Sequence, residues 1–320
     1  NPSDANFRGL NIYKTVSAAL NSHLTKQLDS KLYFNWWEKD NESTHVVFTP
    51  VRAVGGAVAQ SCDVNWTTGA TSATCSNELF HYRKWNAGVD LQFRVNPQNR
   101  VAGGWDYADT KRERIDYDRS KDNKVYIELK NTSLDTVTAK VKYQHMRRRS
   151  DFLFGDLNPL AAAPAPGQTL VSATNNVGFS KWLKRFDLND NDQDLLKLGV
   201  DATPWQHVDL GAEFIWKNNK YKNVELGRQK DNRQELYLTA AAGDPGKFRV
   251  NAFFDFEKTQ YDSRHWVGNL APATFPAAVG AGQYLWEGKV KDRNYVLGLG
   301  ADWAATSQLM FKGSLTWQDT

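Results

Sequence analysis

The chain has 320 residues, and its 40 basic and 36 acidic residues are interspersed, so the formal net charge is only +4. This balance excludes the single-sign field that binding to nucleic acid would use, and no run of about 20 apolar residues offers a membrane-spanning helix. A hydropathy scan would therefore class the chain as soluble, yet it carries 12 Trp, 12 Tyr and 16 Phe, a heavy aromatic load.

Alternation of apolar and polar residues with period two is the main signal along the chain. We expect twelve strands, in chain order near residues 9–24, 30–39, 83–95, 100–110, 122–131, 136–146, 194–202, 207–217, 233–242, 247–258, 291–303 and 308–318. Most are about ten residues or longer. This exceeds the five or six residues typical of soluble proteins and matches the 9 to 11 of a tilted strand that crosses a bilayer.

The expected connections alternate in length. Tight turns such as NPQNR and AAGDPGK alternate with longer polar loops near 40–82, 111–121, 147–193, 218–232 and 259–290. In outer-membrane barrels the tight turns face the periplasm and the long loops face outward. We therefore predict an all-β fold with one transmembrane, antiparallel, up-and-down β-barrel domain over residues 1–320, with long extracellular loops near 40–82, 147–193 and 259–290.

The alternation assigns side chains to two environments. Polar residues opposite the apolar face are expected to point into the barrel lumen and are possible partner contacts: Asp90, Arg94, Asp106, Glu128, Lys130, Lys140, Lys142, Asp209, Glu213, Arg249, Asp255 and Lys312. Aromatic residues at strand ends on the apolar face are expected at the membrane interfaces: Trp36, Trp105, Tyr107, Tyr143, Trp216, Phe256, Trp303 and Trp317. A soluble β-sandwich or propeller explains the polar faces equally well, but it explains the strand length and the alternating loops less well.

The strand count bears on the size of the barrel. If the first tight turn is periplasmic, residues 1–8 and Thr320 both lie at the extracellular rim, whereas single-chain barrels of this kind normally have periplasmic ends. The chain also ends in QDT, without a terminal aromatic residue. We expect the full barrel to contain more than twelve strands.

The two cysteines, Cys62 and Cys75, flank a Gly/Ser/Thr/Ala-rich segment, and we expect them to form a disulfide in an oxidising compartment, with two free thiols as the alternative.

The acidic stretch Asp187 to Asp194 lacks the central Gly and final Glu of an EF-hand, so a polar loop is favoured over a calcium site. Arg147 to Arg149 leave a strand at the outer rim. They suit either lipopolysaccharide phosphates or pairing with Asp116, Asp118 and Asp151.

Several loop and turn signatures resemble one known family. They are Asp116 to Arg119, Arg147 to Phe152, Leu226 to Arg228 with Asp231 and Arg233, Gly243 to Pro245, and Tyr261 to Arg264. This set resembles the MtrB/PioB family of outer-membrane barrels associated with decahaem cytochromes. The resemblance covers about residues 83 to 265 and the last hairpin. An N-terminal Cys-x-x-Cys, which some members carry, is absent, and Cys62 and Cys75 do not match it.

The resemblance implies a barrel that acts as an insulating sleeve in the outer membrane of a Gram-negative bacterium. Its expected partners are a periplasmic multihaem (decahaem-type) c-type cytochrome in the lumen, an extracellular multihaem cytochrome in some cases, and outer-membrane lipid and lipopolysaccharide. The chain has no Cys-x-x-Cys-His, so any haem c belongs to the partner. No catalytic set and no metal-ligand spacing can be placed, so we expect no enzyme. The alternative function is a general or substrate-selective diffusion porin, and a third is a β-rich adhesion protein.

Overall fold

The computed structural model describes residues 8–44, 47–48, 52–54, 57–59, 75–76, 79–112, 117–152, 182, 184, 186–267, 275 and 279–320. Twelve long strands form one sheet: β1 (Asn11–His23), β2 (Leu28–Asn41), β7 (Tyr82–Arg94), β8 (Asn99–Arg112), β9 (Tyr117–Leu134), β10 (Val137–Phe152), β11 (Asn191–Trp205), β12 (Val208–Tyr221), β13 (Gly227–Asp244), β14 (Phe248–Val267), β15 (Tyr284–Ala304) and β16 (Met310–Asp319). Each of the twelve expected strands corresponds to one of these, so the predicted strand count is confirmed for the described residues.

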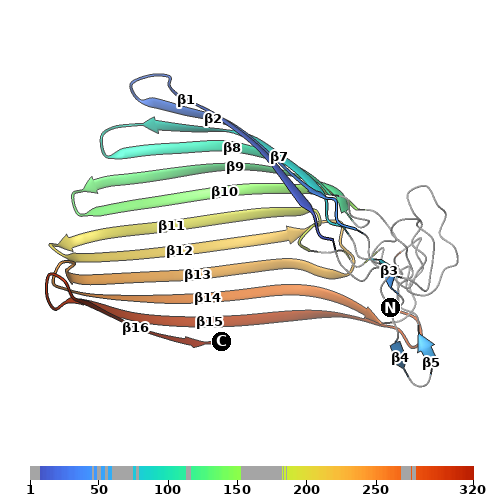
Figure 1. Ribbon diagram of the computed structural model, residues 1–320. Helices are drawn as coiled ribbons and strands as arrows, with labels where there is room; N and C mark the ends of the chain where they lie inside the picture. The colour runs from blue at the N-terminus through green and yellow to red at the C-terminus, as the bar shows by residue number, and fades with distance from the viewer. Residues whose placement is uncertain are drawn as a thin grey trace.

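The sheet is an up-and-down meander. Its spatial order follows the chain from β1 through β2 and β7 to β16, and every neighbouring pair is antiparallel. Two small antiparallel pairs, β3 (Val47–Phe48) with β6 (Cys75–Ser76) and β4 (Arg52–Val54) with β5 (Ala57–Ala59), fall in the connection between β2 and β7. Figure 1 shows one curved layer with the short hairpin connections gathered at one end, and we call the opposite end of the strands the loop end.

The short connections have the backbone conformations that tight hairpins need. His207, in the turn between β11 and β12, has a φ of 63°, in the left-handed region. Gly243, beside the turn between β13 and β14, has a φ of 109°, and a Cβ there would lie 2.2 Å from the carbonyl oxygen of Phe248. Only glycine fits such a position without strain, so this turn depends on Gly243.

The strands at the loop end are longer than the alternation predicts. β14 continues to Val267 and β15 begins at Tyr284, so much of the loop expected at 259–290 is paired strand. In the same way, β12 and β13 reach Tyr221 and Gly227, which leaves little of the loop expected at 218–232. Beyond the apolar band these segments do not alternate regularly, as in RQKDN at 228–232 and TQYDSR at 259–264, so the period-two pattern that marks a strand is lost there.

The sheet has almost no interior of its own. Among the described residues the only buried apolar side chains are Ala108, Leu226 and Trp266, whereas Leu299 is 51% and Leu315 is 69% exposed. A single layer of strands cannot bury an apolar face against itself, so that face needs an apolar solvent. Among the described residues no helix is both long enough and apolar enough to cross a bilayer.

The sheet is open, with β1 and β16 at its two edges. In hydrocarbon an unpaired backbone N–H or C=O costs several kcal/mol, so membrane strands persist only where both edges are paired. Within the membrane both edges must therefore be paired, either with each other or with other strands.

Candidate functional site

The register places all twelve predicted lumen-facing residues on one face of the sheet, which we call the polar face. Asp90 is opposite Gly104 and Lys140 is opposite Lys130, and the same parity runs across the sheet to Asp209, Glu213, Arg249, Asp255 and Lys312. Whether these side chains contact a partner stays a prediction.

The eight predicted interface aromatics all lie on the opposite, apolar face, where aromatic residues meet across strands. The rings of Phe256 and Tyr295 are 5.0 Å apart, and Trp303 stacks on Phe311 at 5.5 Å. On β12 the apolar side chains run from Val208 to Trp216, about 26 Å along the strand at about 3.3 Å per residue. This length suits the outward apolar band, about 25 Å tall, of an outer-membrane barrel.

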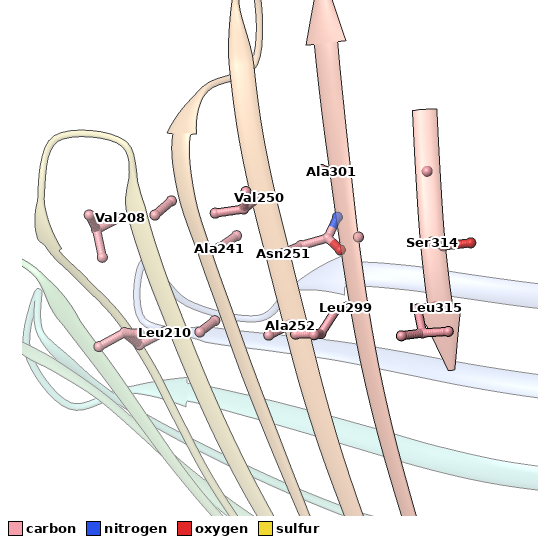
Figure 2. A pocket seen from close by; sticks show the side chains of 14 residues that line it. Val208, Leu210, Ala241, Val250, Asn251, Ala252, Leu299, Ala301, Ser314 and Leu315 are labelled. Carbon is pink, nitrogen blue, oxygen red and sulfur yellow. The ribbon is translucent and has the colours of Figure 1, made fainter. Parts of the chain in front are cut away.

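The apolar face has a hollow near the short-turn end, with a volume of about 680 Å³. Figure 2 shows its lining, which comes from β12, β13, β14, β15 and β16. Small side chains form its floor, among them Ala240, Ala252 and Ala301, and larger ones such as Leu210 and Leu315 stand around it. In a bilayer such a surface is filled by acyl chains, so we assign the hollow to lipid contact.

On the polar face, two tyrosines lie flat across glycines and reach an aspartate one strand further. Tyr33 of β2 crosses Gly88 of β7 and donates a 2.8 Å hydrogen bond to Asp106 of β8. Tyr126 of β9 crosses Gly104 of β8 and donates a 2.7 Å bond to Asp90 of β7. The two arrangements run in opposite directions on adjacent rows of the register. We call them the Tyr–Gly–Asp rows.

Charged neighbours complete these rows. Lys124 is 3.4 Å from Asp106, which also accepts a 2.8 Å bond from the Asn86 amide. Lys31 lies over the ring of Tyr33 at 5.6 Å, and Lys142 lies over the ring of Tyr126 at 4.5 Å. Because both rings lie against the wall, they stay out of the space in front of the polar face.

A ring also lies over a glycine elsewhere on the polar face, between β14 and β15. The ring of Phe253 occupies the space in which a Cβ of Gly298 would lie, with Cε1 only 2.0 Å from that position. Tyr237 follows, with its ring centroid 6.0 Å from that of Phe253. Alternation in the sequence marks Gly298 as a strand residue, but only the register reveals which ring it accommodates.

Opposite charges are paired at several places on the polar face. Lys197 is 2.6 Å from Glu213, and Arg249 is 2.6 Å from Asp209. Towards the loop end, Arg233 bridges Glu235 at 2.8 Å and Glu257 at 3.0 Å. These pairs hold side chains against the wall and leave little net field where they occur.

Near the loop end a hydrogen-bonded cluster joins β11, β12 and β13. Asn219 donates to Asp231 and accepts from Gln193 at 2.7 Å, and Tyr221 donates to Asp231 at 2.6 Å. Burial and this hydrogen bond to a carboxylate raise the pKa of Tyr221, which lies beyond the apolar band, so it stays protonated as a donor.

Beside this cluster, the guanidinium of Arg228 lies between two rings, 4.0 Å from the Phe186 centroid and 4.2 Å from the Tyr261 centroid. This contact attaches the segment before β11 to β13 and β14. The sequence resemblance includes Arg228 and Tyr261, but nothing in the sequence indicates Phe186 as the second ring.

Other sequence expectations have separate outcomes. Arg148 is paired with Asp122 at 2.7 Å and Arg149 with Asp192 at 3.0 Å, so intramolecular pairing does occur. Asp116 and the side chain of Asp118 lie outside the described residues, so pairing with them stays a prediction. The predicted disulfide lies outside the described residues: Cys62 is not described, and only the backbone of Cys75, in β6, is. Within the described ranges no three His, Cys, Asp or Glu side chains form a group that could hold a metal ion.

The fold and its two faces define a class of protein. An up-and-down antiparallel sheet with an apolar outer band, aromatic residues on that band and a hydrated opposite face is the wall of an outer-membrane β-barrel. The sequence pattern of the outer membrane β-barrel porins MtrB/PioB matches residues 14–320, so the chain belongs to that family. Its location is the outer membrane, and we expect the polar face to line the lumen.

Several solved structures are similar in fold. The ferric-catecholate import receptor Fiu of E. coli is 10% identical at a TM-score of 0.47, covering 98% of this chain and 59% of its own. The ferric yersiniabactin uptake receptor FyuA of Yersinia pestis is 13% identical at 0.47, covering 95% and 45%. The chain thus spans about half the length of these two receptors. No curated protein sequence matches significantly.

Proposed function

We propose that this barrel sheaths and positions a multihaem c-type cytochrome for electron transfer across the outer membrane. The observation that carries the proposal is the lumenal wall itself. Aromatic rings lie flat over Gly88, Gly104 and Gly298, and several of its charges, such as Lys197 with Glu213 and Arg249 with Asp209, are paired along the wall. Such a surface leaves room for a wide, hydrophilic occupant and offers it hydrogen-bonding groups of both signs.

In this function the barrel contributes insulation and geometry, and the partner contributes the redox chemistry. The apolar band separates the lumen from lipid over about 30 Å of hydrocarbon, and the polar wall holds the partner in a fixed position. A periplasmic decahaem-type cytochrome would enter from the short-turn end, and an extracellular multihaem cytochrome could meet it at the loop end. In this function the chain itself carries out no catalytic step and holds no covalently bound cofactor.

The alternative is a general or substrate-selective diffusion porin. It is favoured by the many hydrated side chains on the polar face, which would equally suit a water-filled channel. A mixed-sign wall without a full ring of one charge predicts weak ion selectivity for such a channel. The two functions differ in what occupies the lumen.

The test is mild-detergent purification of the full-length barrel from native outer membranes, with haem quantified by its absorbance spectrum. A c-type haem protein that co-purifies in fixed ratio to the barrel and undergoes reversible reduction supports the sheath. A barrel that is free of haem and conducts ions in a planar bilayer contradicts the sheath and favours the porin.

A further inference from the structure

One part of the polar face departs from the pairing seen elsewhere. Four basic residues stand directly beside one another on consecutive strands: Arg94 of β7 is opposite Arg100 of β8, Arg100 is opposite Lys130 of β9, and Lys130 is opposite Lys140 of β10. We call this set the basic row. Neighbouring strands are about 4.8 Å apart, so the four cations fall within about 14 Å.

The basic row has few acids of its own. Lys140 is 3.3 Å from Asp201. Within the described residues, no ion pair within 4 Å involves Arg94, Arg100 or Lys130. Three acids on the same face lie near the row. Asp90 accepts the Tyr126 hydroxyl, and Asp29 of β2, opposite Gln92, pairs with His23. Glu128, the next residue from Lys130 on this face of β9, forms no ion pair within 4 Å among the described residues.

A row of like charges lowers the stability of the sheet unless opposite charges lie against it. Like charges directly opposite on neighbouring strands destabilise a sheet. The remaining strands avoid this arrangement at the same end of the sheet, where Arg249 and Lys312 alternate with Asp209 and Asp302. Arg94, Arg100 and Lys140 are also exposed, so their charges face the lumen.

The shape of the row indicates the class of ligand. The register spreads the four residues along a line across four strands, whereas a site for a single phosphate or carboxylate ion would gather its cations around one point. An extended row matches several carboxylates fixed on a protein surface. The row also lies at the short-turn end, which faces the periplasm in outer-membrane barrels, where a periplasmic protein would first meet the wall.

We propose that the basic row, Arg94, Arg100, Lys130 and Lys140, docks an acidic surface of the protein that enters the lumen from the periplasm. This inference rests on the proposed sheath function and adds the chemistry and the place of the contact. The positive field draws in the acidic side of the partner and sets its rotation about the barrel axis. Small anions would meet the same charges only if the lumen were open.

The experiment uses the full-length barrel in native outer membranes, with the partner present. The row variant is Arg94→Gln with Arg100→Gln and Lys130→Gln. One control, Lys26→Gln with Lys247→Gln, removes charge from the short turns of other hairpins at the same end of the sheet. A second control, Arg94→Lys with Arg100→Lys, keeps the charge of the row. Electrophoretic mobility of unheated and heated samples shows that each variant is folded.

Each variant is extracted in mild detergent, and the haem retained per barrel is measured at rising NaCl. Each exposed pair contributes little by itself, so we expect the row variant to hold the haem protein roughly tenfold more weakly at low salt. The difference should diminish towards 1 M NaCl, where charges are screened. Both controls should retain haem as the unmodified barrel does.

The outcomes separate the inference from the proposed function. If the unmodified barrel and the row variant retain haem with the same salt dependence, the docking role of the row is wrong and the sheath function stands. If the unmodified barrel carries no haem, the sheath function fails and the docking role fails with it. In that case, anion selectivity that the row variant loses, measured as reversal potential in a KCl gradient, would assign the row to small anions.

Discussion

The Tyr–Gly–Asp rows make a sharp prediction for Gly104→Ala. A Cβ at Gly104 would lie 2.5 Å from Cε1 of Tyr126, 2.6 Å from a carboxylate oxygen of Asp90 and 2.8 Å from the backbone oxygen of Val89. The Tyr126 side chain could swing away, but the backbone contact cannot be relieved without moving β7 or β8. The added methyl group therefore both displaces the ring and strains the sheet.

The expected change in the free energy of unfolding is the sum of two costs and one gain. Overpacking of a well-filled site costs about 1 to 3 kcal/mol. Displacing the ring also breaks the Tyr126–Asp90 hydrogen bond, which adds about 1 kcal/mol because the acceptor is charged and the site is partly exposed. Replacing glycine by alanine restores about 0.4 to 1 kcal/mol, because the unfolded chain loses freedom. We expect Gly104→Ala to lower the free energy of unfolding by about 2 kcal/mol.

The matched control is Gly199→Ala on β11. Gly199 lies on the same face of the sheet, but the nearest atom to its added Cβ is Cβ of Lys140 at 3.9 Å, an ordinary contact. This variant should be neutral or more stable by up to about 1 kcal/mol. Both free energies are measured by urea titration of the full-length barrel in detergent or lipid, followed by tryptophan fluorescence.

Two results would refute this reasoning. If Gly104→Ala and Gly199→Ala have the same stability, the glycine contact of Tyr126 has no energetic role. If Tyr126→Phe is as stable as the unmodified chain while Gly104→Ala is not, packing against the glycine matters but the hydrogen bond to Asp90 does not.

Three further predictions test other parts of the structure. Leu299→Arg, at the centre of the apolar band, should lower the free energy of unfolding by about 2 to 4 kcal/mol in a urea titration in lipid. Ser314→Arg, on the polar face, should change it by less than about 1 kcal/mol. Equal effects would contradict the assignment of faces. Alkylation followed by intact mass should add two groups to the chain only after reduction if Cys62 and Cys75 are joined, and labelling without reduction would contradict the disulfide. Arg228→Lys keeps the charge but loses the planar contact with two rings, so limited proteolysis should cut near residues 186–190 several times faster, with Arg83→Lys as a control that leaves this rate unchanged.

The sequence by itself predicts the strands within the membrane and the face on which each side chain lies. Successive residues of a strand point to opposite sides whatever the strand pairs with, so the parity of Val208, Asp209 and Leu210 is a local property. That is why the alternation alone places the twelve strands, the polar residues and the interface aromatics. It does not reveal the extensions of β13, β14 and β15 beyond the apolar band, because apolar and polar residues do not alternate regularly there.

Only the tertiary structure decides what meets across the strands. Arg94 and Lys140 become members of one row through three successive registers, and Arg100, which alternation leaves unremarked, becomes its second member. Tyr33 likewise finds Gly88 and Asp106 on two other strands. Such contacts depend on the length of each turn, since a shift of one residue would move every later side chain to the other face. The sequence determines the two faces of the wall, and the register determines its sites.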